Sequence, residues 1–314
     1  MESTSRYPVV LLAFNRPDFT RRVFEKVRAW KPSRLHLVVD GPRHEFPRDE
    51  ELVAEVKRIV SDIDWQCEVF EDFADSNMGL RARISSGLSR VFEVSDGAII
   101  VEDDCVPDLT FFSYCDELLR RYQDVPEVGV IGGSSRLRGS RVSPYSYDFS
   151  SDLRIWGWAT WARTWKAFVD SGDLEASWSR AERDSIVEQF PFGPRRATMA
   201  KMLSRAAELD SWALPFAVHF KRSGLLSTVP EVNLVENVGF GSHSTHTVFE
   251  DYVAQVESQS LTFPLRHPPS VAELPILDRR ESAQDRLQWW SHPFRPPIDT
   301  FGRLWRYFLQ SLKT

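Results

Sequence analysis

Cysteine is scarce in this sequence, and long hydrophobic runs are missing from it. The 3 cysteines are an odd number without metal-ligand spacing, so neither a disulfide framework nor a structural zinc site is indicated. No window holds 18 consecutive apolar residues, and the first ten residues lack the pattern of a signal peptide. We therefore expect a cytoplasmic protein with reduced, buried thiols.

A long basic run is also missing. The chain of 314 residues has 39 Lys and Arg against 45 Asp and Glu, which gives a formal net charge of −6. This mildly acidic balance lacks the positive surface that nucleic-acid binding requires, so we expect no nucleic-acid partner. Hydrophobic residues make up 42% of the chain, which is enough for a substantial core and excludes disorder as the main state.

The first third of the chain alternates short apolar runs with helical patterns. Apolar runs occupy residues 8–14, 35–40, 67–70 and 98–101, and apolar residues at helical spacing follow the first three runs. Such alternation predicts a mostly parallel, Rossmann-like α/β sheet flanked by helices, with right-handed crossovers. In such sheets, ligands bind in the crevice at the carboxyl ends of the strands.

Polar residues stand where three of these predicted strands end. Asn15 follows the first run and is also placed to cap the next helix, Asp40 ends the second run, and Glu102, Asp103 and Asp104 follow the fourth. Three carboxylates held together by a rigid strand repel one another, and a hard divalent cation removes that repulsion. The triplet therefore predicts a site for Mg²⁺ or Mn²⁺; a solvated acidic turn is the alternative.

Several segments resemble one known family, in the order in which that family has them. In the first half they are PVVLLAFNRP, VVDGPR, SNMGLRARISSGL and AIIVEDDCVPDLTFF, and in the second half WGWATW, LDSW and VPEVNLVENVGFGSHSTHT. Together these segments resemble the GT-A glycosyltransferases, and within them the group that contains N-acetylglucosaminyltransferase I and its bacterial relatives. The similarity is closest over residues 7–135.

The resemblance implies a fold, a function and an organisation. The fold is GT-A, and the function is inverting, metal-dependent transfer of a hexosyl or N-acetylhexosaminyl group from a UDP-sugar in glycan or bacterial polysaccharide biosynthesis. The acceptor is a hydroxyl of a glycan, a lipid-linked molecule or a protein, and the cofactor is Mn²⁺ or Mg²⁺. Residues 1–135 form the nucleotide-sugar-binding half, 136–262 the acceptor and catalytic half of the same domain, and 263–314 a Pro-rich C-terminal extension.

The matching motifs also carry the implied nucleotide contacts. The residues that the resemblance places against the nucleotide are Asn15, Arg16, Asp40, Asn77 and either Arg81 or Arg83. The first two would lie beside the uridine, and Asp40 would accept a hydrogen bond from the base or the ribose. The asparagine at position 77 and the arginine would approach from the following helix, and the sequence does not choose between the two arginines.

The acidic triplet carries the implied metal site. Glu102 and Asp103 would contact the ribose and metal-bound water, and Asp104 would be the direct ligand that bridges the metal to the diphosphate. General chemistry agrees, because the charge on a departing diphosphate needs a cation or an arginine clamp. Cys105 departs from the leucine-like residue that often follows the triplet in the family, which affects packing more than chemistry.

Asp210, in the segment LDSW, matches the position of the family's general base. An inverting transfer needs a carboxylate on the acceptor side to take the hydroxyl proton as the new bond forms. Glu208 is the nearest competitor, and a capping bond at a helix end is the alternative role for Asp210.

His246 lies in the Gly- and Ser-rich segment GFGSHSTHT, which predicts a mobile loop that orders over a bound phosphate. The resemblance implies that His246, rather than His243, contacts the diphosphate or the metal. Trp156, Trp158 and Trp161 fit neither a single helix face nor a strict strand. We expect at least one of these tryptophans in the core, while another forms a wall on which a sugar stacks.

The last segment has an amphipathic helical pattern. Its apolar face is formed by Phe301, Leu304, Trp305, Phe308 and Leu312. Docking within the chain or in a homodimer is the interpretation we favour, and peripheral contact with the inner face of a membrane is the alternative.

Two other functions remain open. A non-catalytic carbohydrate-binding or scaffold protein would keep the aromatic residues without the chemistry, but the acidic triplet and Asp210 together argue against it. A sugar-phosphate nucleotidyltransferase shares a related sheet but requires a Gly-rich, basic phosphate loop after the first strand. The sequence at that place is AFNRPD, which has no glycine.

Overall fold

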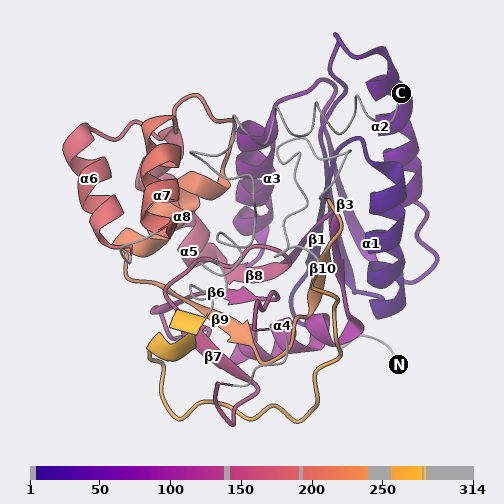
Figure 1. Cartoon of the computed structure of the whole chain (residues 1–314). Helices are drawn as coiled ribbons and strands as arrows, with labels where there is room; N and C mark the ends of the chain where they lie inside the picture. Colours follow the sequence, from indigo (N-terminus) through magenta and orange to yellow (C-terminus); the bar gives the residue numbers. More distant parts are fainter. Residues whose placement is uncertain (1–4, 138–141, 191–193, 240–255, 278, 281–314) are drawn as a thin grey trace, which may run out of the picture.

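An eight-stranded mixed sheet forms the centre of the protein, as a computed structural model shows for residues 5–137, 142–190, 194–239, 256–277 and 279–280 (Figure 1). In spatial order the strands are β3 (Glu68–Phe73), β2 (Arg34–Val39), β1 (Val9–Ala13), β4 (Gly97–Glu102), β8 (Trp158–Trp161), β6 (Val128–Gly132), β9 (Leu226–Pro230) and β7 (Tyr147–Ser150). β8 is antiparallel to both of its neighbours and β7 is antiparallel to β9, whereas the other neighbouring pairs are parallel. A small antiparallel pair, β5 (Cys105–Pro107) and β10 (Val235–Asn237), lies beside this sheet.

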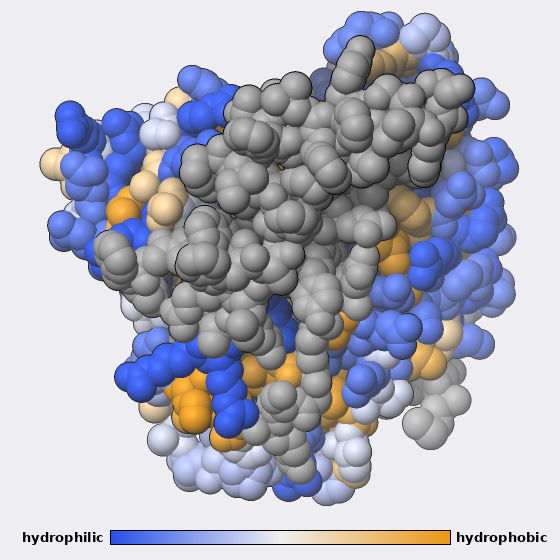
Figure 2. Space-filling model, viewed as in Figure 1, coloured by the Kyte–Doolittle hydropathy of each residue, from blue (hydrophilic) through white to orange (hydrophobic). Residues whose placement is uncertain are grey.

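Helices cover both faces of the sheet (Figure 1). The helices packed on one face are α1 (Pro17–Trp30), α2 (Pro47–Val60) and α4 (Leu109–Arg121). Those on the other face are α3 (Leu80–Val94), α5 (Ala162–Asp170) and α8 (Ala213–Arg222). The outer surface of α1 and α2, on the right in Figure 2, is mostly hydrophilic, as expected for helices that bury a single stripe.

Burial on both faces explains why the first strand is apolar throughout. Val9 and Leu11 of β1 belong to the core under α1, α2 and α4, whereas Val10 and Leu12 belong to the core under α3, α5 and α8. A strand covered on both sides has no position for a polar residue, and an unbroken apolar run results. The Rossmann-like α/β class predicted from such runs is confirmed.

The predicted helix cap at Asn15 is wrong by one residue. α1 begins at Pro17, and Arg16 is the N-cap residue, although its side chain makes no capping bond. Proline suits the first helical position, since its missing N–H has no partner there in any case. Asn15 instead donates from Nδ2 to Oδ1 of Asp49, 2.8 Å away at the start of α2.

The tryptophans of the segment WGWATW are largely core residues. Trp158 and Trp161 lie in β8 and are buried in the cores on its two faces, and Trp156 is partly buried against the core that contains Trp161. Trp158 stacks on Trp212, with ring centroids 5.5 Å apart and an interplanar angle of 18°. This stack joins β8 to the residue just before α8, and therefore holds the start of α8 against the sheet.

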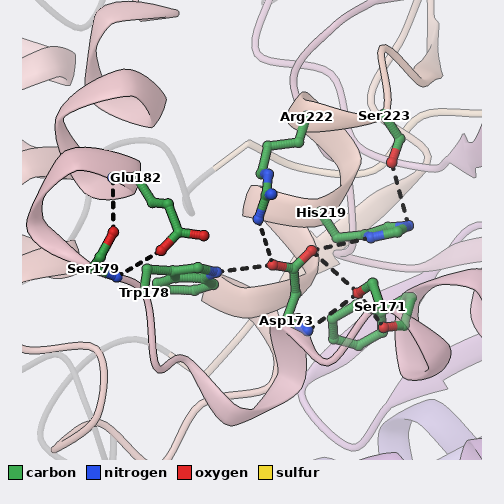
Figure 3. A network of polar contacts seen from close by, with 9 residues as sticks. Ser171, Asp173, Trp178, Ser179, Glu182, His219, Arg222 and Ser223 are labelled. Carbon is green, nitrogen blue, oxygen red and sulfur yellow. Dashed lines mark hydrogen bonds and ion pairs between the residues drawn. The ribbon is translucent and has the colours of Figure 1, made fainter.

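A polar network around Asp173 braces the helical layer beside α8 (Figure 3). Asp173 begins the short helix η1 (Asp173–Glu175), and its carboxylate accepts from Trp178 Nε1 at 2.8 Å and Arg222 Nη1 at 2.9 Å. The Nδ1 atom of His219 lies 3.2 Å from the same carboxylate. Burial lowers the pKa of His219, although Asp173 acts in the opposite direction. Helices α6 (Arg180–Glu188) and α7 (Pro194–Ser204) complete this layer.

In the part of the chain that the structure describes, no helix is long and apolar enough to cross a bilayer.

His36 makes the fold sensitive to acid. Its ring is 6% exposed and stacks on Phe70 with centroids 4.5 Å apart. Burial, with a smaller effect of Arg34, lowers the pKa of His36 from 6.5 to about 4. Below pH 6.5 the unfolded chain binds a proton that the folded chain does not, so the free energy of unfolding falls until the pH reaches the folded-state value. We expect this residue to cost about 2 kcal/mol between pH 7 and pH 5.

Urea unfolding of the wild type and of His36→Phe at the two pH values measures this effect. Phenylalanine keeps a flat ring against Phe70 but cannot bind a proton. The loss of stability at pH 5 should therefore be smaller in the variant by about 2 kcal/mol. An equal loss in both proteins would show that His36 does not carry the acid sensitivity.

Candidate functional site

A cavity of about 380 Å³ opens at the carboxyl ends of β1, β2 and β4. It is the place that the strand pattern predicts for a ligand. The predicted site residues that line this cavity are Asn15, Arg16, Asp40, Asn77, Arg83, Glu102, Asp103, Asp104 and Asp210. The structure therefore brings together residues from both halves of the chain, and of the predicted site residues that the structure describes, Arg81 is the one that does not line the cavity.

Arg16 neutralises part of the acidic triplet. Its Nη1 atom donates to Oδ2 of Asp104 at 2.9 Å, and its Nη2 atom donates to Oδ1 of Asp103. Although burial opposes a charge on Arg16, Asp103 and Asp104 raise the pKa of Arg16 above its ordinary value. The backbone N–H of Phe14 also donates to Asp103, at 3.3 Å. The end of β1 thus holds the end of β4 through this carboxylate.

Glu102 is the last residue of β4 and makes no ion pair among the described residues. Burial, followed by repulsion from Asp104 and Asp103, raises the pKa of Glu102 to about 8. A carboxyl group with this pKa is mostly protonated at neutral pH, so that Glu102 can donate as well as accept a hydrogen bond.

Asp40 ties two loops of the cavity together. Its Oδ1 atom accepts from the backbone N–H of Gly41 at 2.8 Å and of Met78 at 2.9 Å. Its Oδ2 atom accepts from Nδ2 of Asn77 at 2.9 Å, and the same amide donates to the carbonyl oxygen of Gly41 at 3.2 Å. Burial raises the pKa of Asp40, although the hydrogen bonds from the backbone N–H groups of Met78 and Gly41 act against it. Asp40 and Asn77 hence shape the cavity in addition to lining it.

The structure separates the two arginines of α3. Arg83 lines the cavity and is buried, and it donates to the carbonyl oxygen of Val39 and to Asp72. Arg81 does not line the cavity. Its guanidinium group donates to carbonyl oxygens of Ala206, Leu209 and Ser211. Arg81 is therefore a link to the segment that precedes α8.

Asp210 lies over the N-terminus of α3. Its carboxylate accepts from the backbone N–H groups of Leu80 at 2.6 Å and Arg81 at 2.9 Å. Gly79 precedes the helix with φ of 81°, and a Cβ atom there would lie 2.8 Å from Oδ2 of Asp210. Glycine at this position thus permits both the backbone conformation and the approach of the carboxylate. Asp210 does cap a helix end, but the helix comes from the other half of the chain.

Glu208, the competitor of Asp210, lies away from the cavity. It is exposed and pairs with Arg205 at 3.1 Å. It lines a neighbouring open groove, which Asp210 also lines.

Sequence reasoning missed two polar residues of the cavity, Arg43 and Asn237. Arg43 pairs with Asp49 at 2.6 Å and lies over the ring of Phe46, 4.0 Å from its centroid. The signal was present, because Arg43 ends the segment VVDGPR. Asn237 ends β10, and its side chain accepts from the backbone N–H of Gly239 at 2.9 Å.

Some predictions fall on residues that the structure does not describe. His246, its neighbour His243 and the amphipathic segment 301–312 lie outside the described residues. Their predicted roles stay predictions.

The residues at the end of β4 fit a hard divalent cation if a ligand supplies further oxygen atoms. The side chain of Asp104 is 15% exposed and lines the cavity. A Cβ atom at Gly239 would overlap Oδ2 of Asp104, so glycine leaves room for this oxygen. Within the described ranges, no three His, Cys, Asp or Glu side chains are grouped to hold a metal ion by themselves. One or two carboxylates plus phosphate oxygens is the usual ligand set of Mg²⁺.

Two solved structures resemble the chain at low identity. One is a 4-diphosphocytidyl-2C-methyl-D-erythritol synthase from Anaerococcus prevotii, 7% identical with a TM-score of 0.33, over 70% of this chain and 98% of the other. The second is a UDP-glucose pyrophosphorylase in complex with UDP-glucose, 10% identical with a TM-score of 0.36, over 71% of this chain and 90% of the other. No family model and no curated protein matches the chain. At these values, neither likeness bears on the chemistry of the cavity.

We expect Asp40→Ala to destabilise the fold even when no ligand is bound. The change leaves the N–H groups of Gly41 and Met78 without their acceptor and removes one of the two acceptors of the Asn77 amide. Since hydrogen bonds to charged groups contribute more than neutral ones, the free energy of unfolding should fall by about 3 kcal/mol in urea unfolding. Asn77→Ala removes a single one of these bonds to Asp40 and should cost about 1 kcal/mol. An Asp40→Ala variant as stable as the wild type would contradict the structural role.

Proposed function

We propose that the protein is an inverting, metal-dependent glycosyltransferase of the GT-A type that uses a UDP-sugar. The observation that carries the proposal is the common cavity of the acidic triplet at the end of β4 and Asp210 from the second half. Asp104 and Asp210 are distant in sequence, yet both line it, as a transferase requires of its metal ligand and its base. The motif order in the sequence supports the same function.

In this proposal the nucleoside lies against the loops after β1 and β2. Asn15, Asp40, Asn77 and Arg83 line that part of the cavity and offer amide, carboxylate and guanidinium groups to a base and a ribose. Arg16 lies between these loops and the acidic triplet, where its positive charge can meet a diphosphate.

Asp104 is the residue that would hold the divalent cation. Bound there, Mg²⁺ or Mn²⁺ would supply positive charge to the diphosphate as it leaves the sugar. Asp103 is less suited to this role, because it is buried and already engaged by Arg16 and the N–H of Phe14. Its part is to hold Arg16 in place.

Asp210 would take the proton of the acceptor hydroxyl. The first two N–H groups of α3 hold the carboxylate of Asp210 in place at the mouth of the cavity. Each carboxylate oxygen can accept two hydrogen bonds, so the bonds from Leu80 and Arg81 leave capacity for a substrate hydroxyl. Arg81 is a positioning residue here, because its guanidinium group binds the carbonyl oxygens on both sides of Asp210.

Nucleotidyl transfer is the second candidate function. The segment after β1 argues against it, because the backbone N–H of Phe14, which a phosphate loop would offer to the ligand, donates to Asp103. No glycine is present there to let phosphates approach the backbone.

The products formed from UDP-sugars separate the two functions. With MnCl₂ and UDP-glucose or UDP-N-acetylglucosamine, a glycosyltransferase should slowly release UDP as water replaces the acceptor. Addition of EDTA should abolish the release, and so should Asp104→Asn, which keeps the size of the side chain but removes its charge. Formation of UTP on addition of pyrophosphate would instead show nucleotidyl transfer, and an inert protein would show neither function.

Asp210→Asn should lower the rate of UDP release by roughly 10² to 10⁴, the usual contribution of a general base. Asparagine can still cap α3, so the free energy of unfolding should fall by no more than about 1 kcal/mol, and UDP affinity should change little. Glu208→Gln is the matched control, because this carboxylate lies outside the cavity.

The anomeric configuration of the sugar released to water supplies an independent check. An α-linked donor should give the β-sugar in proton NMR spectra recorded before mutarotation. A retained α-anomer, or near-normal activity of Asp210→Asn, would contradict the assigned role.

A further inference from the structure

Arg16 holds both aspartates of the triplet at once. The Nη2 atom of Arg16 contacts Oδ1 of Asp103, its Nε atom lies 3.4 Å from Oδ2 of Asp103, and its Nη1 atom lies 2.9 Å from Oδ2 of Asp104. Every ion pair that the described residues make to these two carboxylates comes from this one guanidinium group. A guanidinium group has five N–H donors, so it can keep one of these contacts while it gives up another.

The two contacts differ in how exposed they are. The side chain of Asp103 is 3% exposed, whereas that of Asp104 is 15% exposed and lines the cavity. Asp103 also accepts from the backbone of Phe14, so it is fixed to the end of β1. The contact with Asp103 is therefore the anchor of Arg16, and the contact with Asp104 is the one that a ligand in the cavity can replace.

We propose that Arg16 is a built-in counter-ion for Asp104, released only when a nucleotide diphosphate offers its Nη1 atom another anion. A divalent cation therefore binds at Asp104 together with the diphosphate and only weakly before it. The part of this inference that concerns the diphosphate rests on the function proposed above. The part that concerns Arg16 and the cation stands on the contacts alone.

The ligand set supports this coupling. A cation arriving alone would compete with Arg16 for Oδ2 of Asp104, and it would find no group of three metal-ligating side chains among the described residues. A diphosphate changes both conditions, because it attracts the guanidinium group and supplies oxygen ligands of its own.

Binding of Mn²⁺ without nucleotide tests the role of Arg16. Titration calorimetry, or loss of the free Mn²⁺ signal in electron paramagnetic resonance, should show that Arg16→Gln binds MnCl₂ at least about tenfold more tightly than the wild type. An adjacent opposite charge shifts the proton affinity of a carboxylate by roughly this factor or more, and the same charge acts on a metal ion. Arg22→Gln is the control, since Arg22 lies on the same helix but pairs with Glu236 at 3.7 Å. It should bind MnCl₂ as the wild type does.

Addition of UDP tests the coupling. Saturating UDP should strengthen Mn²⁺ binding to the wild type by at least about tenfold, and the gain should be clearly smaller in Arg16→Gln, where Asp104 is already free. If UDP binds to neither protein, the proposed function fails, but the comparison without nucleotide still decides the role of Arg16.

A second pair of variants guards against misfolding, because Arg16→Gln leaves Asp103 buried without its partner. Asp103→Asn removes that charge and keeps Arg16 on Asp104, and the double variant Arg16→Gln with Asp103→Asn frees Asp104 without a buried unpaired charge. The double variant should bind MnCl₂ more tightly than Asp103→Asn by the same tenfold factor. Equal Mn²⁺ affinity within both pairs, with thermal unfolding unchanged, would overturn the inference.

Discussion

The contact between Asp210 and the N-terminus of α3 holds the candidate site together. The carboxylate accepts from the first two N–H groups of the helix, and Arg81 returns from the same turn to the carbonyl oxygens around Asp210. Asp210 thus provides an acceptor for N–H groups at the start of the helix that have no partner within the helix. Arg81 in turn provides a donor for the carbonyl oxygens of Leu209 and Ser211. This exchange fixes the segment just before α8 over the cavity that the first half forms.

Packing below this contact determines its geometry. Trp212, two residues after Asp210, is 2% exposed and stacks on Trp158 of β8, which is itself paired to β4. The strand that carries the acidic triplet and the segment that carries Asp210 therefore share one rigid support. Gly79 completes the arrangement, because any side chain there would meet the carboxylate. The segments WGWATW, LDSW and SNMGLRAR are distant in sequence, but together they position the carboxylate of Asp210.

The first four strands, β1 to β4, and most of the cavity were predictable, because strands buried on both faces leave unbroken apolar runs and their polar ends must meet at one edge. The choice between Arg81 and Arg83 was harder. Residues two positions apart on a helix, such as 81 and 83, point about 200° away from each other, so only one of them can face the cavity. Which one does so depends on the rotation of the helix. Arg83 adjoins the buried Ile84, but its neutralisation by Asp72 of β3 is a tertiary contact that no spacing reveals. Asn15 was misplaced as a cap for a similar reason, since its partner Asp49 belongs to another helix.

Charge at the end of β4 limits what can bind there. Three ionised carboxylates would carry a charge of −3, but burial keeps Glu102 mostly protonated at neutral pH, with a pKa of about 8, and Arg16 offsets one of the two aspartates. The remaining charge is about −1, and Mg²⁺ is usually bound by one or two carboxylates together with phosphate oxygens. A diphosphate adds the missing negative charge and the missing oxygen atoms. The same local charge balance that lets this strand end fold without a ligand thus favours a cation and a diphosphate bound together over either one alone.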